Sequence, residues 1–264
     1  MLTVVKNELR IIFLNFKYNL IKQMDNKLSF IMQILFMMVN NGMMLIQWVV
    51  IFSLQESIGG YGFKEIALLW ALAASTYGVS HFFFANAIEL SNLIVSGKLD
   101  AFLIQPKNVL INITSSESKP SALGDILYGI VILIFLGVDF KTWLLFILFT
   151  ITGGIIATAL AIIWHSFSFY FKNTEDIALT LSNILICFAT YPITIFNQKT
   201  KLIFSTIVPI IFMVYIPLDV IIKFSSINIF IVLGFTLFVI ILAFLLFHFG
   251  LKKYSSSNLM SARI

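Results

Sequence analysis

Long apolar stretches separated by short polar ones dominate the pattern of this chain. Seven runs without a charged residue lie between its acidic and basic side chains, at residues 28–55, 66–88, 126–138, 142–171, 177–198, 202–218 and 224–251. A helix needs about 20 apolar residues to cross the hydrocarbon core of a bilayer. The pattern therefore predicts an all-α, polytopic membrane protein with short loops between its helices.

Six of these runs are predicted to cross the membrane, at residues 28–52, 65–87, 122–138, 142–171, 177–196 and 227–249. The remaining run, 202–218, is interrupted by Pro209 and Pro217, and a proline inside a helix removes a backbone hydrogen bond. Irregular backbone at membrane depth needs cover from neighbouring helices or a water-filled cavity. We therefore predict that residues 197–226 form a re-entrant segment on the outer side, between spans five and six.

The distribution of basic residues supports this topology. With the N-terminus inside, six spans place twelve Lys and Arg residues on the inner side, Lys172 and Arg263 among them, and five on the outer side. A seventh span would change these counts to ten and seven. Because cytoplasmic loops carry an excess of Lys and Arg, the charges favour six spans with both termini cytoplasmic.

The first 27 residues are predicted to form an amphipathic helix at the membrane surface. Apolar residues recur there at helical spacing, whereas Lys6, Arg10 and Lys17 fall outside the apolar stripe. Such a helix can lie flat among membrane lipids, with its basic residues near anionic headgroups. The alternative is a poorly structured basic leader that only sets the orientation of the chain.

Composition narrows the classes of function. Hydrophobic residues make up 60% of the 264 residues and charged residues 11%, and the mean hydropathy is +1.01. Six spans leave no room for a soluble catalytic domain. The single cysteine, Cys187, lies in an apolar run, which excludes a disulfide framework and a thiolate metal site. The sequence has no Gly-x-x-x-x-Gly-Lys-[Ser/Thr] phosphate-binding motif, so we expect it not to be an enzyme that hydrolyses ATP itself. We expect no metal site and no nucleic-acid partner.

The longest polar stretch, residues 88–121, is the most informative loop. Its segment 96–106 reads SGKLDAFLIQP and mixes charges with apolar residues, namely Leu99, Phe102, Leu103 and Ile104. We expect these four side chains to be exposed. Apolar residues on a water-facing loop indicate a surface on which a partner docks, although they could equally rest on the lipid headgroups.

Segment 96–106 resembles the signature loop of bacterial ABC transporter permeases of the type-2 (exporter) class. The resemblance is to the small six-span subfamily, in which a Gly-Lys/Arg-Leu-Asp turn leads to an apolar run ending in Pro. Segment 122–129 (ALGDILYG) is similar to that subfamily's third span, Tyr191-Pro192-Ile193 with Phe196 to its fifth, and segment 250–256 (GLKKYSS) to its C-terminal end. The motifs are short, and their order and spacing over nearly the whole chain carry the resemblance.

The resemblance implies one transmembrane permease domain over residues 1–264, with a cytoplasmic elbow (1–27), a coupling loop (88–121) and the outer re-entrant region (197–226). It implies a subunit of an ATP-driven exporter in the bacterial cytoplasmic membrane. Two permease subunits, identical or related, would pair above two copies of a cytoplasmic ATP-binding subunit. That subunit would hold ATP and Mg, and this chain would need no cofactor.

The alternative function is an ion-coupled secondary transporter or a channel without an ATPase. Such a protein is expected to show an internal inverted repeat or several intramembrane charges. The sequence shows neither feature. The substrate itself is not indicated by any motif.

Three sets of candidate site residues follow from this reading. The resemblance assigns contact with the ATPase to Glu89, Gly97, Lys98, Leu99, Asp100, Phe102 and Pro106. It assigns an outer gate to Tyr191, Pro192, Pro209 and Pro217.

The third set consists of intramembrane polar residues that could line a pathway, because polar groups are costly in hydrocarbon. These residues are Asn40, Asn41, Gln47 and His165. Each could instead form a hydrogen bond between helices. For Asp125, near the end of a span, packing or coupling is favoured over contact with a substrate.

Overall fold

The computed structural model describes residues 2–171 and 174–255. Lys172 and Arg263, which entered the charge count, and the last residue of segment 250–256 lie outside these residues. The described residues form twelve α-helices and no β-strand, which confirms the all-α prediction. The α-helices are α1 (Leu2–Met24), α2 (Lys27–Leu54), α3 (Phe63–Phe83), α4 (Leu90–Val95), α5 (Asp100–Leu103), α6 (Val109–Thr114), α7 (Ser121–Phe135), α8 (Phe140–Ser166), α9 (Glu175–Phe188), α10 (Gln198–Thr206), α11 (Ile216–Ile222) and α12 (Ser226–Leu251). Short helical turns are η1 (Ala85–Ala87), η2 (Phe167–Phe169), η3 (Ile193–Ile195) and η4 (Ile211–Tyr215).

The predicted spans correspond to helices of unequal length. Among the described residues, α2, α3, α8 and α12 are each long and apolar enough to cross a membrane, and α10 with α11 makes a fifth candidate if the bent pair counts as one span. The third and fifth predicted spans are α7, with 15 residues, and α9, with 14 residues. At about 1.5 Å per residue these two helices are shorter than a hydrocarbon core of about 30 Å. The protein is an all-α, polytopic membrane protein.

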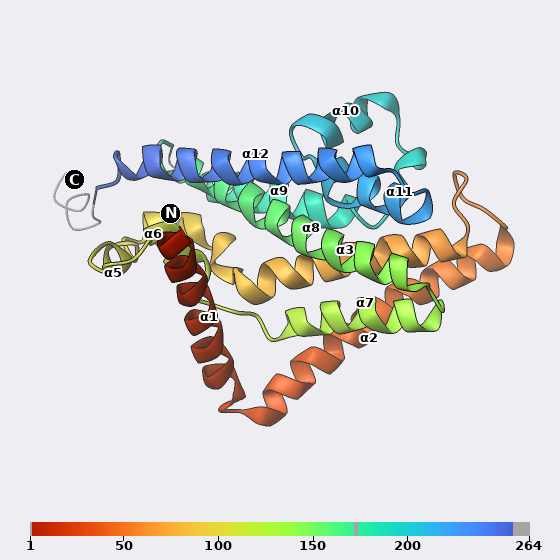
Figure 1. Ribbon diagram of the computed structural model, residues 1–264, viewed down its shortest axis with the longest axis horizontal. Coiled ribbons are helices and arrows are strands. Elements are labelled where there is room, and N and C mark those ends of the chain that lie inside the picture. The colour runs from red at the N-terminus through yellow and green to blue at the C-terminus, as the bar shows by residue number, and fades with distance from the viewer. Residues whose placement is uncertain (1, 172–173, 256–264) are drawn as a thin grey trace.

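The long helices run roughly along the longest axis of the molecule (Figure 1). The start of α1 and the end of α12 lie at the same end of the bundle, together with α5 and α6, and α1 lies across the axis there. The opposite end carries α10 and α11. These two helices are bent by 83° relative to each other. Neither reaches the end of the bundle where α5 and α6 lie. This is the arrangement expected of a re-entrant segment.

The two prolines of this segment occupy positions where a regular helix is not required. Pro209 is buried between α10 and the π-helical turn η4. Pro217 lies in the first turn of α11, where proline is tolerated because an amide there has no intrahelical partner. Pro209 therefore lies at the bend between the two helices, whereas Pro217 is accommodated in the first turn of α11.

Helix α3 forms the centre of the bundle, packed against α7 and α8. In the most apolar stretch of α3, and likewise of α8, 78% of the residues are buried, against 11% for α2 and 22% for α12. Helices α2 and α12 therefore turn most of their side chains outward. Many of these side chains are large and apolar, as expected for a surface in contact with lipid.

Glycines allow the closest helix contacts. A Cβ atom added to Gly124 of α7 would lie 2.5 Å from the carbonyl oxygen of Ile34 in α2. One added to Gly78 of α3 would lie 2.8 Å from the carbonyl oxygen of Ala122 in α7. Small residues at such contacts let helix backbones approach, which is the main source of helix association in lipid.

Replacing Gly124 with Ala is therefore expected to destabilise the protein by about 1–3 kcal/mol, because the added methyl group overpacks the α2–α7 contact. The matched control is Gly234→Ala in α12, where an added Cβ meets nothing within 4 Å. This control should be neutral or stabilising by up to about 1 kcal/mol. Thermal unfolding of the two purified variants in detergent measures the difference. Equal melting temperatures would contradict the close α2–α7 approach.

Candidate functional site

The loop between α3 and α7 is a compact structure of short helices. The turns η1, α4, α5 and α6 follow one another at the end of the bundle where α1 starts and α12 ends. Gly97 joins α4 to α5 with a positive φ of 73°, a conformation that glycine adopts without steric cost. The amide of Leu99 then donates to the carbonyl oxygen of Leu93 at 3.1 Å, which closes the turn.

The prediction that Leu99 is exposed is wrong. Its side chain is fully buried, because the turn at Gly97 folds it into the apolar core beneath the loop. Phe102 is half-buried. The apolar residues that do reach the surface are Val95, Leu103 and Ile104.

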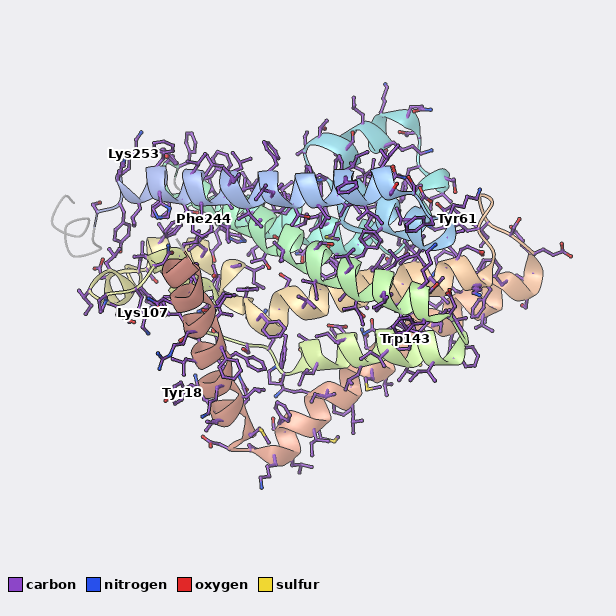
Figure 2. All side chains as sticks on the ribbon, in the orientation of Figure 1. Tyr18, Tyr61, Lys107, Trp143, Phe244 and Lys253 are labelled. Carbon is purple, nitrogen blue, oxygen red and sulfur yellow. The ribbon has the colours of Figure 1, made fainter. Side chains whose placement is uncertain are left out.

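Five exposed residues of this loop are together called the loop tip: Val95, Lys98, Leu103, Ile104 and Lys107. Ile104 is its most exposed apolar side chain, at 86%. Lys98 and Lys107 are also exposed. Figure 2 shows Lys107 at this end of the molecule. The loop tip thus combines an apolar centre with positive charge.

The remaining predicted coupling residues lie around the loop tip. Pro106 is exposed, and Glu89 is half-buried just before α4. Asp100 accepts a hydrogen bond of 2.9 Å from the hydroxyl of Tyr254, beyond the end of α12. Burial first, and the Asp100 carboxylate second, raise the pKa of Tyr254 above its ordinary value. Tyr254 therefore stays protonated and continues to donate, which ties α5 to the C-terminal part of the chain.

An amide ladder fastens α1 to this loop. We use this name for Asn15, Asn19 and Gln23, whose side-chain amides all donate to residues in or just after α6. The bonds of Asn15 run to Asn112 Oδ1 (3.2 Å) and Ser115 Oγ (2.9 Å). The Nδ2 of Asn19 donates to the carbonyl oxygen of Ser115 and to Ser118 Oγ, and Nε2 of Gln23 to the carbonyl oxygen of Ser118, at 3.1–3.2 Å.

A polar cluster joins α4 to the C-terminal end of α8 and to the residue before α9. His165 of α8 is fully buried, and its Nδ1 lies 2.7 Å from Oγ of Ser91 in α4. The hydroxyl of Ser168 donates to the same Ser91 oxygen and is bonded to Thr174, at 2.8 Å each. Thr174 directly precedes α9. We call these four residues the histidine cluster.

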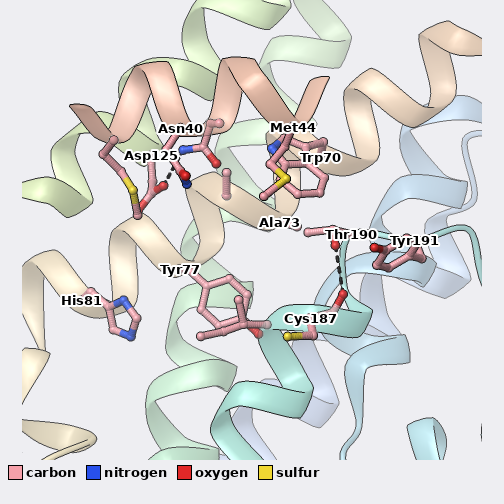
Figure 3. Close-up of a pocket in the computed structure, with 14 residues that line it drawn as sticks. Asn40, Met44, Trp70, Ala73, Tyr77, His81, Asp125, Cys187, Thr190 and Tyr191 are labelled. Atoms are coloured by element: carbon pink, nitrogen blue, oxygen red, sulfur yellow. Dashed lines mark hydrogen bonds between the residues drawn. The ribbon is translucent and has the colours of Figure 1, made fainter. Parts of the chain in front are cut away.

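A cavity of about 340 Å³ lies farther along the bundle, between α2, α3, α7 and the end of α9. Figure 3 shows residues from all four segments surrounding this space. Asn41 Nδ2 of α2 donates to Oδ1 of Asp125 in α7 at 2.6 Å. Trp70 Nε1 and the hydroxyl of Tyr77, both from α3, have no hydrogen-bond partner in the described part of the chain.

The cavity brings together some of the predicted pathway residues and leaves others outside. The predicted pathway residues Asn40 and Asn41 line it, together with Tyr191, which was predicted for the outer gate. Gln47 is exposed on α2, and His165 belongs to the histidine cluster. The roles of these residues stay predictions, but the structure places His165 between the loop and α9 rather than in the cavity.

Two of the predicted outer-gate residues lie within the re-entrant segment, and the other two lie just after α9. Pro192, Pro209 and Pro217 are buried, whereas Tyr191 is exposed. The hydroxyl of Tyr215 donates to the carbonyl oxygens of Phe188 (2.7 Å) and Tyr191 (2.9 Å). Tyr215 thereby fastens the re-entrant segment to the end of α9, a role that the sequence did not indicate.

The amide ladder, in contrast, has a signal in the sequence. Asn15, Asn19 and Gln23 recur every four residues, so they share one face of a helix. An amide stripe on a helix that is otherwise apolar and basic indicates a polar partner surface. No such pattern marks Ser91 as the partner of His165, because these residues are 74 positions apart.

Comparison with known proteins gave one match. A sequence model that describes ABC-2 family transporter proteins matches residues 36–258. No match was found among curated proteins or among solved structures.

Removing the ladder should free α1 from the loop. The triple substitution Asn15→Ala, Asn19→Ala and Gln23→Ala is expected to cost about 0.5–1.5 kcal/mol per lost hydrogen bond. Hydrogen exchange at residues 109–118, followed by mass spectrometry, should therefore speed up. Gln33→Ala is the control, since its exposed amide donates only to Ser29 one turn away. Unchanged exchange in the triple variant would show that the ladder does not hold the loop.

Proposed function

The chain belongs to the ABC-2 family of transporter proteins, and on that premise we propose that it is the permease subunit of an ATP-driven exporter, with ATP hydrolysis in a separate subunit. Membership makes it a membrane component of an ABC transporter. The observation that carries the coupling to an ATPase is the loop tip, an exposed apolar and basic surface on a loop that is otherwise firmly packed. ATP and Mg would be held by the partner.

The loop tip has the chemistry of a docking surface. Its apolar centre, Ile104 with Val95 and Leu103, is flanked by Lys98 and Lys107. An apolar centre with a polar rim is the usual anatomy of a protein interface. We therefore place two copies of the ATP-binding subunit at this end of a permease pair, which makes it the cytoplasmic end. Both termini would then be cytoplasmic, in the bacterial inner membrane.

The histidine cluster offers a route by which movement of the loop could reach the cavity. Ser91 lies on α4, just before the loop tip, and is bonded to His165 and Ser168. Ser168 is bonded in turn to Thr174 at the start of α9, and the end of α9 lines the cavity. Under our proposal, ATP-driven displacement of the loop moves α9 relative to α3. Export is the direction that the family resemblance favours.

A second permease subunit, identical or related, would pack against the outward face of α2. Asn40 and Gln47 are exposed on that face, among large apolar side chains. Amide side chains in hydrocarbon gain by bonding across helices. Pairing there would also place the cavity beside the subunit contact.

Replacing Ile104 with Asp tests the docking surface. A central interface residue typically contributes more than about 1 kcal/mol to binding, and the new carboxylate is buried without a partner if the ATPase docks there. We expect the amount of ATPase that co-purifies with the chain from native membranes to fall at least about tenfold. Leu54→Asp is the control. Leu54 is also an exposed apolar residue, at 80%, but it is the last residue of α2, at the other end of the bundle from the loop tip.

The outcomes separate the competing functions. If no ATPase co-purifies with the unmodified chain, the proposed function is wrong, and an ion-coupled carrier becomes the working hypothesis. If an ATPase co-purifies equally well with Ile104→Asp, the loop tip is not the docking surface. Size-exclusion chromatography of each variant checks that it is folded.

A further inference from the structure

We propose that the cavity between α2, α3, α7 and α9 binds an organic cation with an apolar or aromatic body, through the carboxylate of Asp125. The inference rests on the proposed function, in which this cation is the transported substrate. Three features of the cavity support it: its size, its charge and its unpaired polar groups.

The cavity is of a size for a small organic molecule. Its volume of about 340 Å³ lies at the lower end of the range of about 300–1,000 Å³ for ligand sites. The space arises on α3, where Ala73 and Ala74 separate the large side chains of Trp70 and Tyr77. Figure 3 shows Trp70, Ala73 and Tyr77 of α3 around the same space as Asn40 and Met44 of α2.

The charge of the cavity is set by one residue. Asp125 is the only acidic side chain among the described residues that line it; no Lys or Arg lines it, and His81 contributes an imidazole. Asn41 donates to Oδ1 of Asp125, and the second oxygen has no hydrogen-bond donor among the described residues. A carboxylate can accept several hydrogen bonds. Because an unbalanced charge inside a membrane protein is costly, a cationic ligand would supply the missing counter-charge.

The other groups of the cavity suit the body of such a ligand. Trp70, Tyr77 and Tyr191 line it, and aromatic faces attract organic cations. The hydroxyl of Tyr77, a residue only 8% exposed, has no bonding partner in the described structure, and neither has Trp70 Nε1. Buried polar groups are normally satisfied, so these two donors indicate hydrogen-bond acceptors on the ligand. An anion would meet the Asp125 carboxylate, and the imidazole of His81 is the only basic side chain among the described residues that line the cavity.

Binding to the purified chain, without an ATPase, tests the inference. The probe is benzoylcholine, an organic cation with an aromatic ring and an ester acceptor, and 3,3-dimethylbutyl benzoate is the neutral comparison compound, in which a carbon atom replaces the charged nitrogen. Equilibrium dialysis in detergent should show that the chain binds the cation at least about tenfold more tightly than the neutral compound. Asp125→Asn should weaken cation binding at least about tenfold and leave the neutral compound unchanged, because the amide keeps an acceptor for Asn41 but loses the charge.

Two further variants keep the test sharp. Asp219 is an acidic residue of α11 that does not line the cavity. The variant Asp219→Asn should therefore bind the cation as the unmodified chain does. Ala74→Phe fills the cavity and should weaken binding of both compounds. Equal binding of the cation by Asp125→Asn, or no preference for the cation, would overturn the inference.

Failure of this inference can be told apart from failure of the proposed function. If the ATPase co-purifies but the cation does not bind, only the substrate class is wrong. If the cation binds through Asp125 but no ATPase associates with the chain, the cation site stands and the ATP-driven mechanism falls.

Discussion

The close packing of α3 against α7 and α8 is the constraint on which the rest of the structure depends. Lipid tails are as apolar as the side chains, so burial of apolar area drives little association between helices in a membrane. Close approach of the helix backbones at small residues takes its place, as at Gly78 in α3, which faces α7, and at Gly129 in α7, which faces α3. Gly153 and Gly154 of α8 meet α3 in the same way, with added Cβ atoms 2.5–2.8 Å from side-chain atoms of α3. Three helices thereby form a rigid centre.

The elements that carry the proposed function lie outside this centre. Helix α2 contacts it through one face, and α9 is short and ends in an irregular segment. Segments with fewer buried contacts open at lower free energy than the core. The cavity lies where these two peripheral helices meet α3, so its shape can change without unpacking α3 from α7 and α8. The hydrogen bonds of Tyr215 hold the end of α9 to the re-entrant segment during such a change.

Helix positions followed from the sequence, whereas the site depended on tertiary contacts. Apolar runs determine where helices form, so each predicted span contains a helix, and the proline-containing run is bent. The crossing of the membrane by all six stays a prediction, because α7 and α9 are shorter than the other four helices. The exposure of Leu99 was predicted wrongly, because hydropathy does not show that a turn at Gly97 points this residue inward. The pairs Asn41–Asp125 and Ser91–His165 join residues more than 70 positions apart, and no local pattern predicts such pairs.

Asp125 links the packing of α2 to the chemistry of the cavity. Its hydrogen bond to Asn41 is a direct polar contact between α7 and α2, and the same carboxylate is the charge that a cation would meet. A ligand that binds the second oxygen while Asn41 keeps the first strengthens the hold on α2. A ligand that displaces Asn41 removes this polar contact and leaves α2 held to α7 by packing alone. A ligand shifts a conformational equilibrium only by its differential affinity for the two states. Competition between the ligand and Asn41 for the Asp125 carboxylate would therefore decide whether binding closes or opens the α2 side of the cavity.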